Sequence, residues 1–250
     1  AWSHFSGNTG DTQITFIDIS DNSKKVWTLP NDNKVGNYGS ISDVDSNGNL
    51  YISDRPNHRI RKVDTNGNIS TFAGTGSAGF SGDGGAASSA EIRQPYQLTT
   101  DSEGNLYFCD AGNDVIRKVD TNGIITTVAG IGESRGFSGD GGAATSAKLR
   151  EPLGVAVDSD GNIYIGDHGN HRIRKVDTNG NISTIAGTGN SGDSGDYGDA
   201  TLADISNPSG LDVDMSGNIY FCDYTGRVRK IWTSGIITTI VKNLNAPYQY

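Results

Sequence analysis

Short runs of alternating apolar and polar residues, closed by Gly-containing turns, recur along most of the chain. In one example, four such runs follow one another at residues 154–158, 162–165, 172–177 and 182–186. Alternation with a period of two is typical of a half-buried β-strand, and Asn-Gly or Asp-Gly between two runs indicates a hairpin because both residues accept a positive φ. The long helical period is absent from the sequence. The pattern therefore predicts units of four short antiparallel strands.

The four-strand unit is repeated. The string Gly-Asn-(Leu/Ile)-Tyr occurs four times, and an Asp stands three residues after each Tyr, at Asp54, Asp110, Asp167 and Asp223. Repetition of a four-stranded antiparallel unit around an axis produces a β-propeller, in which only short, protected strand edges remain. The sequence therefore predicts an all-β propeller with four full blades between about residues 39 and 240.

The two ends of the chain predict a fifth blade that is split. Residues 245–249 (Asn-Ala-Pro-Tyr-Gln) are similar to residues 93–97 (Arg-Gln-Pro-Tyr-Gln), which open a first strand. We therefore predict a single domain over residues 1–250, a five-bladed propeller. Its first blade is split between about 1–30 and 245–250, and its ring closes by pairing of the N- and C-terminal strands. The alternative is a fragment of a six-bladed propeller. The other strands of the split blade are expected at residues 2–5, 13–19 and 26–29.

The segment after the second strand of each unit resembles the NHL repeat. Residues 170–174 (Asn-His-Arg-Ile-Arg) carry its Asn-His core, residues 57–60 match them, and Asn113-Asp114 keeps the Asn but not the His. The resemblance covers about residues 39–240 and implies a propeller, usually with six blades. It implies no single function, because function resides in sites carried by the fold. NHL proteins include secreted amide-forming lyases, RNA-binding propellers and receptor-type protein-interaction modules.

Charge and hydropathy narrow the classes of partner. The chain has 20 Lys and Arg against 29 Asp and Glu, a net charge of −9. Nucleic acid is not expected as a partner, because its binding depends on neutralising Lys and Arg. No run approaches the ~18 apolar residues of a membrane span. The start at Ala1, without a Met, fits a mature secreted protein whose leader has been removed or a chain that has been trimmed, and we expect a secreted or extracellular-surface location. Cys109 and Cys222 hold the same strand position two blades apart, and we expect two free, buried thiols.

A Gly-rich connection between the fourth strand and the next unit is the main candidate site. It occurs at residues 79–87 and 136–144 and, in a divergent form, at 193–200. In the structural interpretation, its Asp accepts backbone N–H bonds and caps a single helical turn, at residues 143–149 in the second connection. In the functional one, a Phe beside an Asp stacks on and hydrogen-bonds a sugar ring, and three such loops form a multivalent lectin. The candidate ligand-binding residues are Phe80, Asp83, Phe137, Asp140, Asp196 and Tyr197.

The third connection is also a candidate metal site, because it gathers Asp193, Asp196 and Asp199 within seven residues. Calcium takes about 6–8 oxygen ligands, which carboxylates and carbonyls supply, so calcium is the candidate cofactor. The ordered spacing of an EF-hand loop is absent. Two other acidic turns, at residues 45–49 and 158–162, fall between the first two strands of their units, where a tight hairpin already explains them.

Two further patterns bear on catalysis. The recurring Asp at the end of the second strand faces basic residues such as Arg117 and Arg172, and an ion pair that stabilises the blade is favoured over a ring of carboxylates at a substrate mouth. The amide-forming lyases that the family resembles hold a catalytic zinc with histidines, and such a site needs about three protein ligands. No three of the histidines here obviously converge. They are His4, His58, His168 and His171.

These observations favour a non-catalytic, secreted or surface binding module for a protein or glycan ligand. The alternatives are a multivalent carbohydrate-binding lectin that uses the Gly-rich connections and a metal-dependent lyase of the amide-forming NHL type. A protein-interaction module predicts an exposed apolar or aromatic patch. The lectin hypothesis predicts similar pockets at the three connections, with Phe80 and Phe137 exposed. The lyase hypothesis predicts zinc in the axial channel. Ligand identity and oligomeric state stay open.

Overall fold

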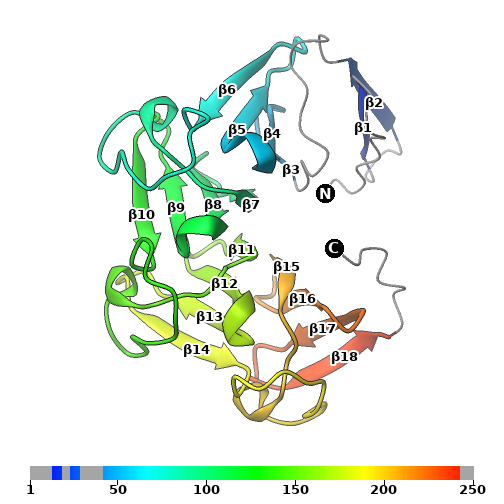
Figure 1. Cartoon of the computed structure of the whole chain (residues 1–250). Coiled ribbons are helices and arrows are strands. Elements are labelled where there is room, and N and C mark those ends of the chain that lie inside the picture. The colour runs from blue at the N-terminus through cyan, green and yellow to red at the C-terminus, as the bar shows by residue number, and fades with distance from the viewer. Residues whose placement is uncertain (1–12, 19–22, 29–41, 243–250) are drawn as a thin grey trace.

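The computed structural model describes residues 13–18, 23–28 and 42–242, and β-strands dominate it. Four four-stranded antiparallel sheets are arranged around a central axis (Figure 1), and the strands of each sheet neighbour one another in chain order. We call these sheets blades I to IV. The all-β propeller prediction is confirmed for these four blades.

The strand bounds agree closely with the alternating runs of the sequence. Blade I comprises β3 (Ser42–Val44), β4 (Leu50–Asp54), β5 (Arg59–Val63) and β6 (Ile69–Ala73). Blade II comprises β7 (Pro95–Thr100), β8 (Leu106–Asp110), β9 (Val115–Val119) and β10 (Ile125–Ala129). Blade III comprises β11 (Gly154–Val157), β12 (Ile163–Asp167), β13 (Arg172–Val176) and β14 (Ile182–Ala186). Blade IV comprises β15 (Ser209–Val213), β16 (Ile219–Asp223), β17 (Arg227–Ile231) and β18 (Ile237–Val241).

The predicted split blade is described only in part. β1 (Gln13–Asp18) and β2 (Ser23–Thr28) form an antiparallel pair, in register from Gln13 opposite Thr28 to Asp18 opposite Ser23. The strand expected at residues 2–5, the strand expected at 245–250 and their pairing lie outside the described residues. Closure of the ring at five blades therefore stays a prediction.

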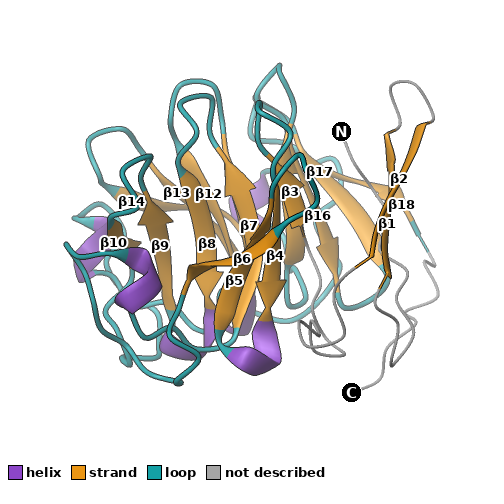
Figure 2. Cartoon of the chain, turned by 90° about the horizontal axis from the view of Figure 1, so that it is seen from above, coloured by secondary structure: helices purple, strands orange, loops and turns teal. Residues whose placement is uncertain are grey.

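Single 3-10 turns lie between strands at two recurring places. Three of them join the second and third strands of a blade: η1 (Arg55–Asn57), η3 (Ala111–Asn113) and η5 (His168–Asn170). Three others lie in the connections between blades: η2 (Ala87–Ser89), η4 (Ala144–Ser146) and η6 (Ala200–Leu202). Figure 2 shows the tight hairpins projecting from one face of the propeller and most of the short helices lying toward the other. Among the described residues, no helix is long and apolar enough to cross a membrane.

The Gly-Asn-(Leu/Ile)-Tyr string is explained by the hairpin between the first two strands. In blade III, one oxygen of Asp158 accepts the backbone N–H of Asn162 at 2.8 Å, and the other accepts from the Asn162 side chain at 2.8 Å and from the Tyr164 hydroxyl at 3.0 Å. Gly161 has a φ of 89°, which a residue with a Cβ rarely adopts. Asp45 makes the same set of bonds in blade I, so the hairpin interpretation of both acidic turns is confirmed.

The hydrophobic core consists of layers between consecutive blades. Tyr51 of blade I packs with Phe108 of blade II, and Cys109 of blade II packs with Val155 of blade III. Each fully buried apolar side chain contributes about 1.5–3 kcal/mol relative to an exposed one. Cys109 is buried and free as predicted, but Cys222 is exposed, so the prediction of two buried thiols was wrong for one. In the described part of the chain, no further four-stranded sheet follows blade IV to cover that position.

Candidate functional site

Three long straps join the blades and lie against the outer strand of the blade that follows. The first strap spans residues 79–92, the second 136–149 and the third 192–205. In the first, the Gly84 N–H donates to the carbonyl of Ile125 in β10 at 2.8 Å, and the Ile125 N–H donates back to Gly85 at 3.0 Å. Each strap therefore adds backbone pairing at the outer edge of a blade, and the Gly-rich sequence lets two backbones approach closely.

The Asp of each strap binds a fully buried Arg on the third strand of the following blade. The Arg117 guanidinium lies 2.6 Å from an Asp83 oxygen and also donates to the carbonyl of Ser81. A buried charge must be paired and hydrogen-bonded, and the strap supplies both kinds of partner. We expected this Asp to accept backbone N–H bonds and to cap the turn at residues 143–149, and both expectations were wrong. The donor is a guanidinium, and η4 begins after Ala143 with no side-chain cap bond. The equivalent pairs are Asp140–Arg174 at 2.7 Å and Asp196–Arg229 at 3.0 Å.

The two strap phenylalanines cover these arginines. The Phe80 ring centre lies 5.2 Å from the Arg117 guanidinium carbon, and the Phe137 ring centre lies 4.8 Å from that of Arg174. Phe137 also contacts Arg172, at 3.8 Å. Phe80 is half-buried, whereas Phe137 is 42% exposed. One ring face of each Phe is therefore engaged inside the protein. Sugar stacking on Phe80 and Phe137 stays a prediction.

The Asp that ends the second strand is a buried anchor. Asp110 accepts the Arg93 N–H at 2.7 Å and the Asn113 side chain at 2.9 Å, and it lies 3.7 Å from Arg117. Burial raises the pKa of Asp110 to about 7 against these favourable contacts. The predicted Asp–Arg pairing within the blade is present. In blade III, Arg172 lies opposite Asp167 in the strand register, and its neighbour Arg174 forms the ion pair. The equivalent residues there are Asp167, Arg150, Asn170 and Arg174, with an ion pair of 3.4 Å.

The residue after the repeated Asn links neighbouring blades. Nδ1 of His58, in blade I, accepts the backbone N–H of Gln94, which precedes β7, at 3.1 Å. Both residues have a positive φ, 52° and 51°. This role was not predicted from the sequence, although the recurrence of His or Asp at one position of the repeat was its signal. The same bond joins His171 to Asn207 at 3.1 Å and Asp114 to Glu151 at 2.6 Å.

The candidate metal ligands have other partners. Asp193 forms an ion pair with Arg227, Asp196 binds Arg229, and Asp199 accepts the Thr201 N–H at 2.8 Å as the cap of η6. Throughout the part of the chain that the structure describes, no three His, Cys, Asp or Glu side chains form a group that could hold a metal ion. Calcium binding stays a prediction, and it would require these carboxylates to exchange their partners.

Among the described histidines, His168 and His171 lie close together, since both contact Asn207, but His58 lies at another pair of blades. His58 and His171 link different pairs of blades, as described above. His168 is buried, and its ring lies 5.1 Å from that of Tyr224. Burial lowers the pKa of His168 to about 4, so its ring is neutral at physiological pH. His4 lies outside the described residues.

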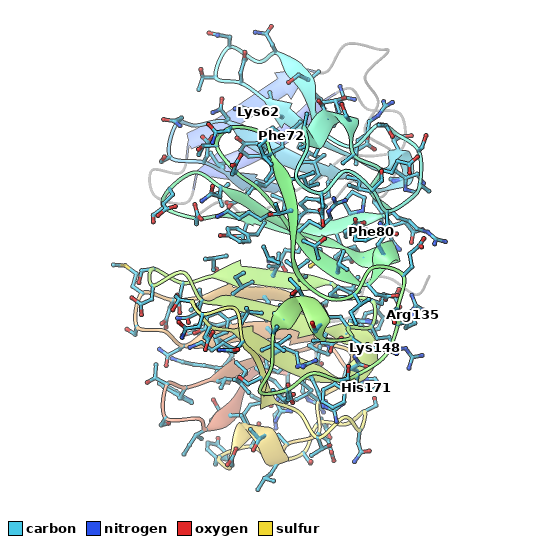
Figure 3. All side chains as sticks on the ribbon, turned by 90° about the vertical axis from the view of Figure 1, so that its left-hand side faces the viewer. Lys62, Phe72, Phe80, Arg135, Lys148 and His171 are labelled. Atoms are coloured by element: carbon cyan, nitrogen blue, oxygen red, sulfur yellow. The ribbon has the colours of Figure 1, made fainter. Side chains whose placement is uncertain are left out.

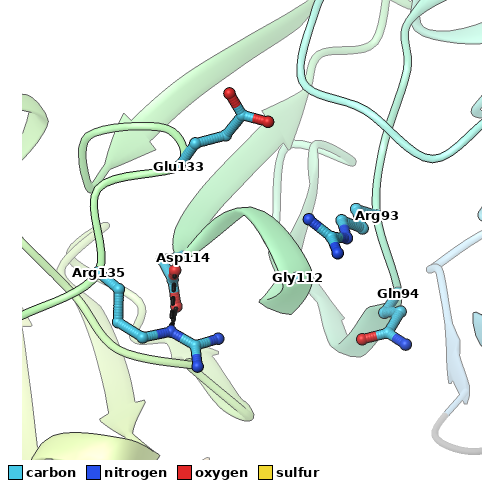
Figure 4. A pocket seen from close by; sticks show the side chains of 6 residues that line it. All are labelled: Arg93, Gln94, Gly112, Asp114, Glu133 and Arg135. Carbon is cyan, nitrogen blue, oxygen red and sulfur yellow. Dashed lines mark hydrogen bonds and ion pairs between the residues drawn. The ribbon is translucent and has the colours of Figure 1, made fainter.

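A small polar pocket of about 320 Å³ opens in blade II (Figure 4). Asp114 and Arg135 form an ion pair of 3.3 Å at one side of the pocket. Figure 4 shows Arg93 and Glu133 at other sides of the pocket. The stem of Arg93 packs on Gly112, where a Cβ would lie 2.6 Å from Arg93 Cγ. Figure 3 shows Phe80, Arg135, Lys148 and His171 along one side of the molecule. The residues that line the pocket of Figure 4 are Arg93, Gln94, Gly112, Asp114, Glu133 and Arg135.

Four exposed large apolar residues lie in the third strap and the β17–β18 hairpin of blade IV, whereas Ile131 and Phe137 lie between blades II and III. In the third strap, Tyr197 is 80% exposed and Leu202 is 74% exposed. In the adjoining β17–β18 hairpin, Trp232 is 43% exposed and Ile236 is 39% exposed. The Tyr197 N–H donates to the carbonyl of Ile237 at 2.7 Å, so strap and hairpin are backbone neighbours. We call Tyr197, Leu202, Trp232 and Ile236 the rim patch.

Solved structures show the same fold at low sequence identity. The virginiamycin B lyase of Staphylococcus aureus superposes with a TM-score of 0.58 and 17% identity, over 94% of this chain and 65% of that one. An auxiliary nutrient binding protein from Bacteroides thetaiotaomicron gives a TM-score of 0.61 and 17% identity, over 86% of this chain and 52% of that one. At such identity the likeness concerns the fold alone.

Sequence comparisons identify the family. Human Teneurin-1 is 33% identical over 156 residues, which is 55% of this chain and 6% of that protein, and mouse Teneurin-4 is 28% identical over 222 residues, 77% and 8%. The chain therefore spans less than a tenth of the length of these relatives. The NHL repeat model matches residues 43–63, and the model described as the teneurin NHL domain matches residues 76–136, 133–193 and 188–247. Because these last matches cover more than half of the chain, the protein belongs to the teneurin NHL domain family.

Proposed function

We propose that this chain is a non-catalytic module at an extracellular or cell-surface location and that it binds a protein ligand. The observation that carries the proposal is the rim patch. Large apolar side chains that gather on the surface mark interaction sites, whereas scattered single ones do not. Tyr and Trp are also the residues most enriched among those that dominate binding energy at protein interfaces.

The polar groups that recur in the blades have structural roles. The strap carboxylates Asp83, Asp140 and Asp196 each neutralise a buried Arg, and His58 and His171 each accept a backbone N–H from the next blade. These groups hold the blades together, so they are not free to act as acid, base or metal ligand without loss of those contacts. A rigid scaffold of this kind suits binding through its loops.

A glycan ligand receives less support than a protein ligand. A lectin site would use the strap Asp and Phe residues together, but the Asp83 and Asp140 carboxylates bind Arg117 and Arg174 at 2.6 Å and 2.7 Å. The Phe137 ring is occupied on one face by Arg172. Sugar binding would have to compete with these internal contacts.

The test is a paired screen of the purified chain. One arm is a glycan array, run with calcium and repeated with a chelator, and the other is a display library of extracellular protein fragments. We expect saturable binding to protein fragments and a blank glycan array. Selective glycan binding without protein binding would overturn the proposal. If chelation abolished that glycan binding, Asp193, Asp196 and Asp199 would be implicated as calcium ligands.

A further inference from the structure

The three straps provide an internal comparison, because their residues align one to one. Where the third strap has Tyr197, the first two have Gly84 and Gly141. Where the third has Leu202, the others have Ser89 and Ser146. The backbone bonds to the outer strand are the same in all three, so the straps share this backbone arrangement but present different surfaces. The large apolar residues are therefore not needed to build the strap.

Tyr197 is unfavourable for the fold at its position. Its φ is 68°, and the two equivalent glycines have φ values of 81° and 83°. A residue with a Cβ is strained in this left-handed region, whereas Gly is not. The side chain is 80% exposed, so little packing within the chain offsets the strain. A strained, exposed aromatic residue is accounted for by a contact outside the chain.

The third strap is also the most acidic. Residues 192–205 contain four Asp and no Lys or Arg, a net charge of −4, whereas residues 79–92 have −2 and residues 136–149 have zero. Asp199 is exposed and stands where the other straps have Ala86 and Ala143, so one of the extra charges lies on the surface. Asp193 and Asp196 pair with Arg227 and Arg229, and Lys230 Nζ lies 3.5 Å from the Trp232 ring centre. The negative charge that a partner meets beside Tyr197 and Leu202 is therefore that of Asp199.

The acidic and apolar residues belong to backbone segments that are paired with each other. Asp199 forms an isolated β-bridge with Ile236, and the Leu202 N–H donates to the Asp199 carbonyl at 3.0 Å. The Trp232 N–H donates to the Ile236 carbonyl at 2.8 Å across the hairpin turn. In Figure 1 the third strap (yellow) lies at the outer rim beside the start of β18.

We propose that the rim patch binds a segment of a partner protein in which Lys or Arg residues flank large apolar side chains. The apolar side chains would pack against Tyr197 and Leu202, and the cations would pair with Asp199. Complementary charge favours such a segment over an acidic one. This inference rests on the proposed function, since it specifies where and with what chemistry the protein ligand docks.

The experiment uses an array of 12-residue peptides in three matched sets. In the first, Lys and Arg alternate with Leu and Tyr; in the second, Glu replaces each cation; in the third, Ser replaces each apolar residue. We expect the chain to bind the first set selectively. Tyr197→Gly and Leu202→Ser should each raise Kd about tenfold or more, as substitutions of anchor residues do.

Stability separates loss of binding from loss of folding. Tyr197→Gly should raise the melting temperature while it weakens binding, because Gly relieves the backbone strain. Met215→Ser is the matched control, because Met215 is a fully exposed apolar residue of blade IV outside the rim patch, and Ser occupies its position in the other blades. That variant should bind like the wild type.

Several results would overturn the inference. These are equal binding of the charge-reversed peptides, unchanged Kd in Tyr197→Gly and Leu202→Ser, or no peptide binding while a captured protein fragment still binds both variants. The last result would leave the proposed function intact, whereas absence of any peptide or protein ligand for the wild type would remove both. A dimer seen by sedimentation equilibrium and lost in Tyr197→Gly would identify a second copy as the occupant instead.

Discussion

The contact between Asp140 and Arg174 gives a quantitative test of how the straps hold the propeller. Substitution of Asp140 by Ala removes two bonds to a fully buried guanidinium, at 2.7 Å to Nη2 and 3.1 Å to Nε, and one to the Thr184 hydroxyl at 2.7 Å. Arg174 keeps a carbonyl partner and Asp167, so its charge is not left alone.

The expected loss follows from these contacts. Removal of one partner of a buried pair costs about 3–5 kcal/mol, and a hydrogen bond to a charged group contributes about 1.5–3 kcal/mol. The Asp140 side chain is 39% exposed, which screens its charge and reduces these values. We therefore expect Asp140→Ala to lower the free energy of unfolding by about 2–3 kcal/mol, or about 4–12 °C in melting temperature for a domain of this size.

Urea unfolding followed by tryptophan fluorescence measures the change, with an unchanged m-value as the check that the transition remains two-state. Asp160→Asn is the control, because Asp160 is an exposed hairpin residue outside the straps. A double-mutant cycle with Arg174→Met should show coupling above 1 kcal/mol, which is about the upper limit for exposed pairs. Coupling near zero, or a loss below about 0.5 kcal/mol, would refute the reasoning.

Three further predictions concern single residues. Cys222 should react with a thiol reagent in the folded protein while Cys109 reacts only on unfolding, and equal rates would contradict the burial difference. Burial and nearby arginines lower the pKa of His171. The contribution of His171 to the free energy of unfolding is therefore complete above about pH 6.5 and decreases as the pH falls below that value. His171→Asn should flatten this part of the pH profile of unfolding. Gly187→Ala should destabilise more than Gly180→Ala, because both have positive φ but only at Gly187 would a Cβ overlap the His171 carbonyl oxygen; comparable melting temperatures would contradict this.

The strands were predictable because each is encoded locally. Residues 182–186, for example, were expected as a fourth strand and form β14, since alternation and the preceding Asn-Gly act within a few residues. Because the unit is repeated, the strands of the remaining blades could be predicted from those of one blade. The same reasoning fails at Cys222, which copies the strand position of Cys109 but lacks its covering layer.

The candidate site could be predicted only in outline because its contacts join distant residues. The donor to Asp140 lies 34 residues away in the next blade, and nothing local distinguishes a guanidinium from a backbone N–H. In blade III, Arg172 and Arg174 lie on the same face of β13, since side chains alternate along a strand. The sequence therefore could not decide which of the two pairs with Asp167.

The straps show how one repeated element can serve both stability and binding. The Asp that binds the buried Arg is present in all three straps, so this position is fixed by the requirement to neutralise a buried charge. The positions of Tyr197 and Leu202 face solvent and make no such contact, so a large side chain there leaves the ion pair in place. The backbone strain at Tyr197 then sets a limit, because binding by this residue must be worth more than the stability it costs. The rim patch is consequently the place where the third strap departs from its role in holding the blades, and where a change to Gly would separate binding from folding.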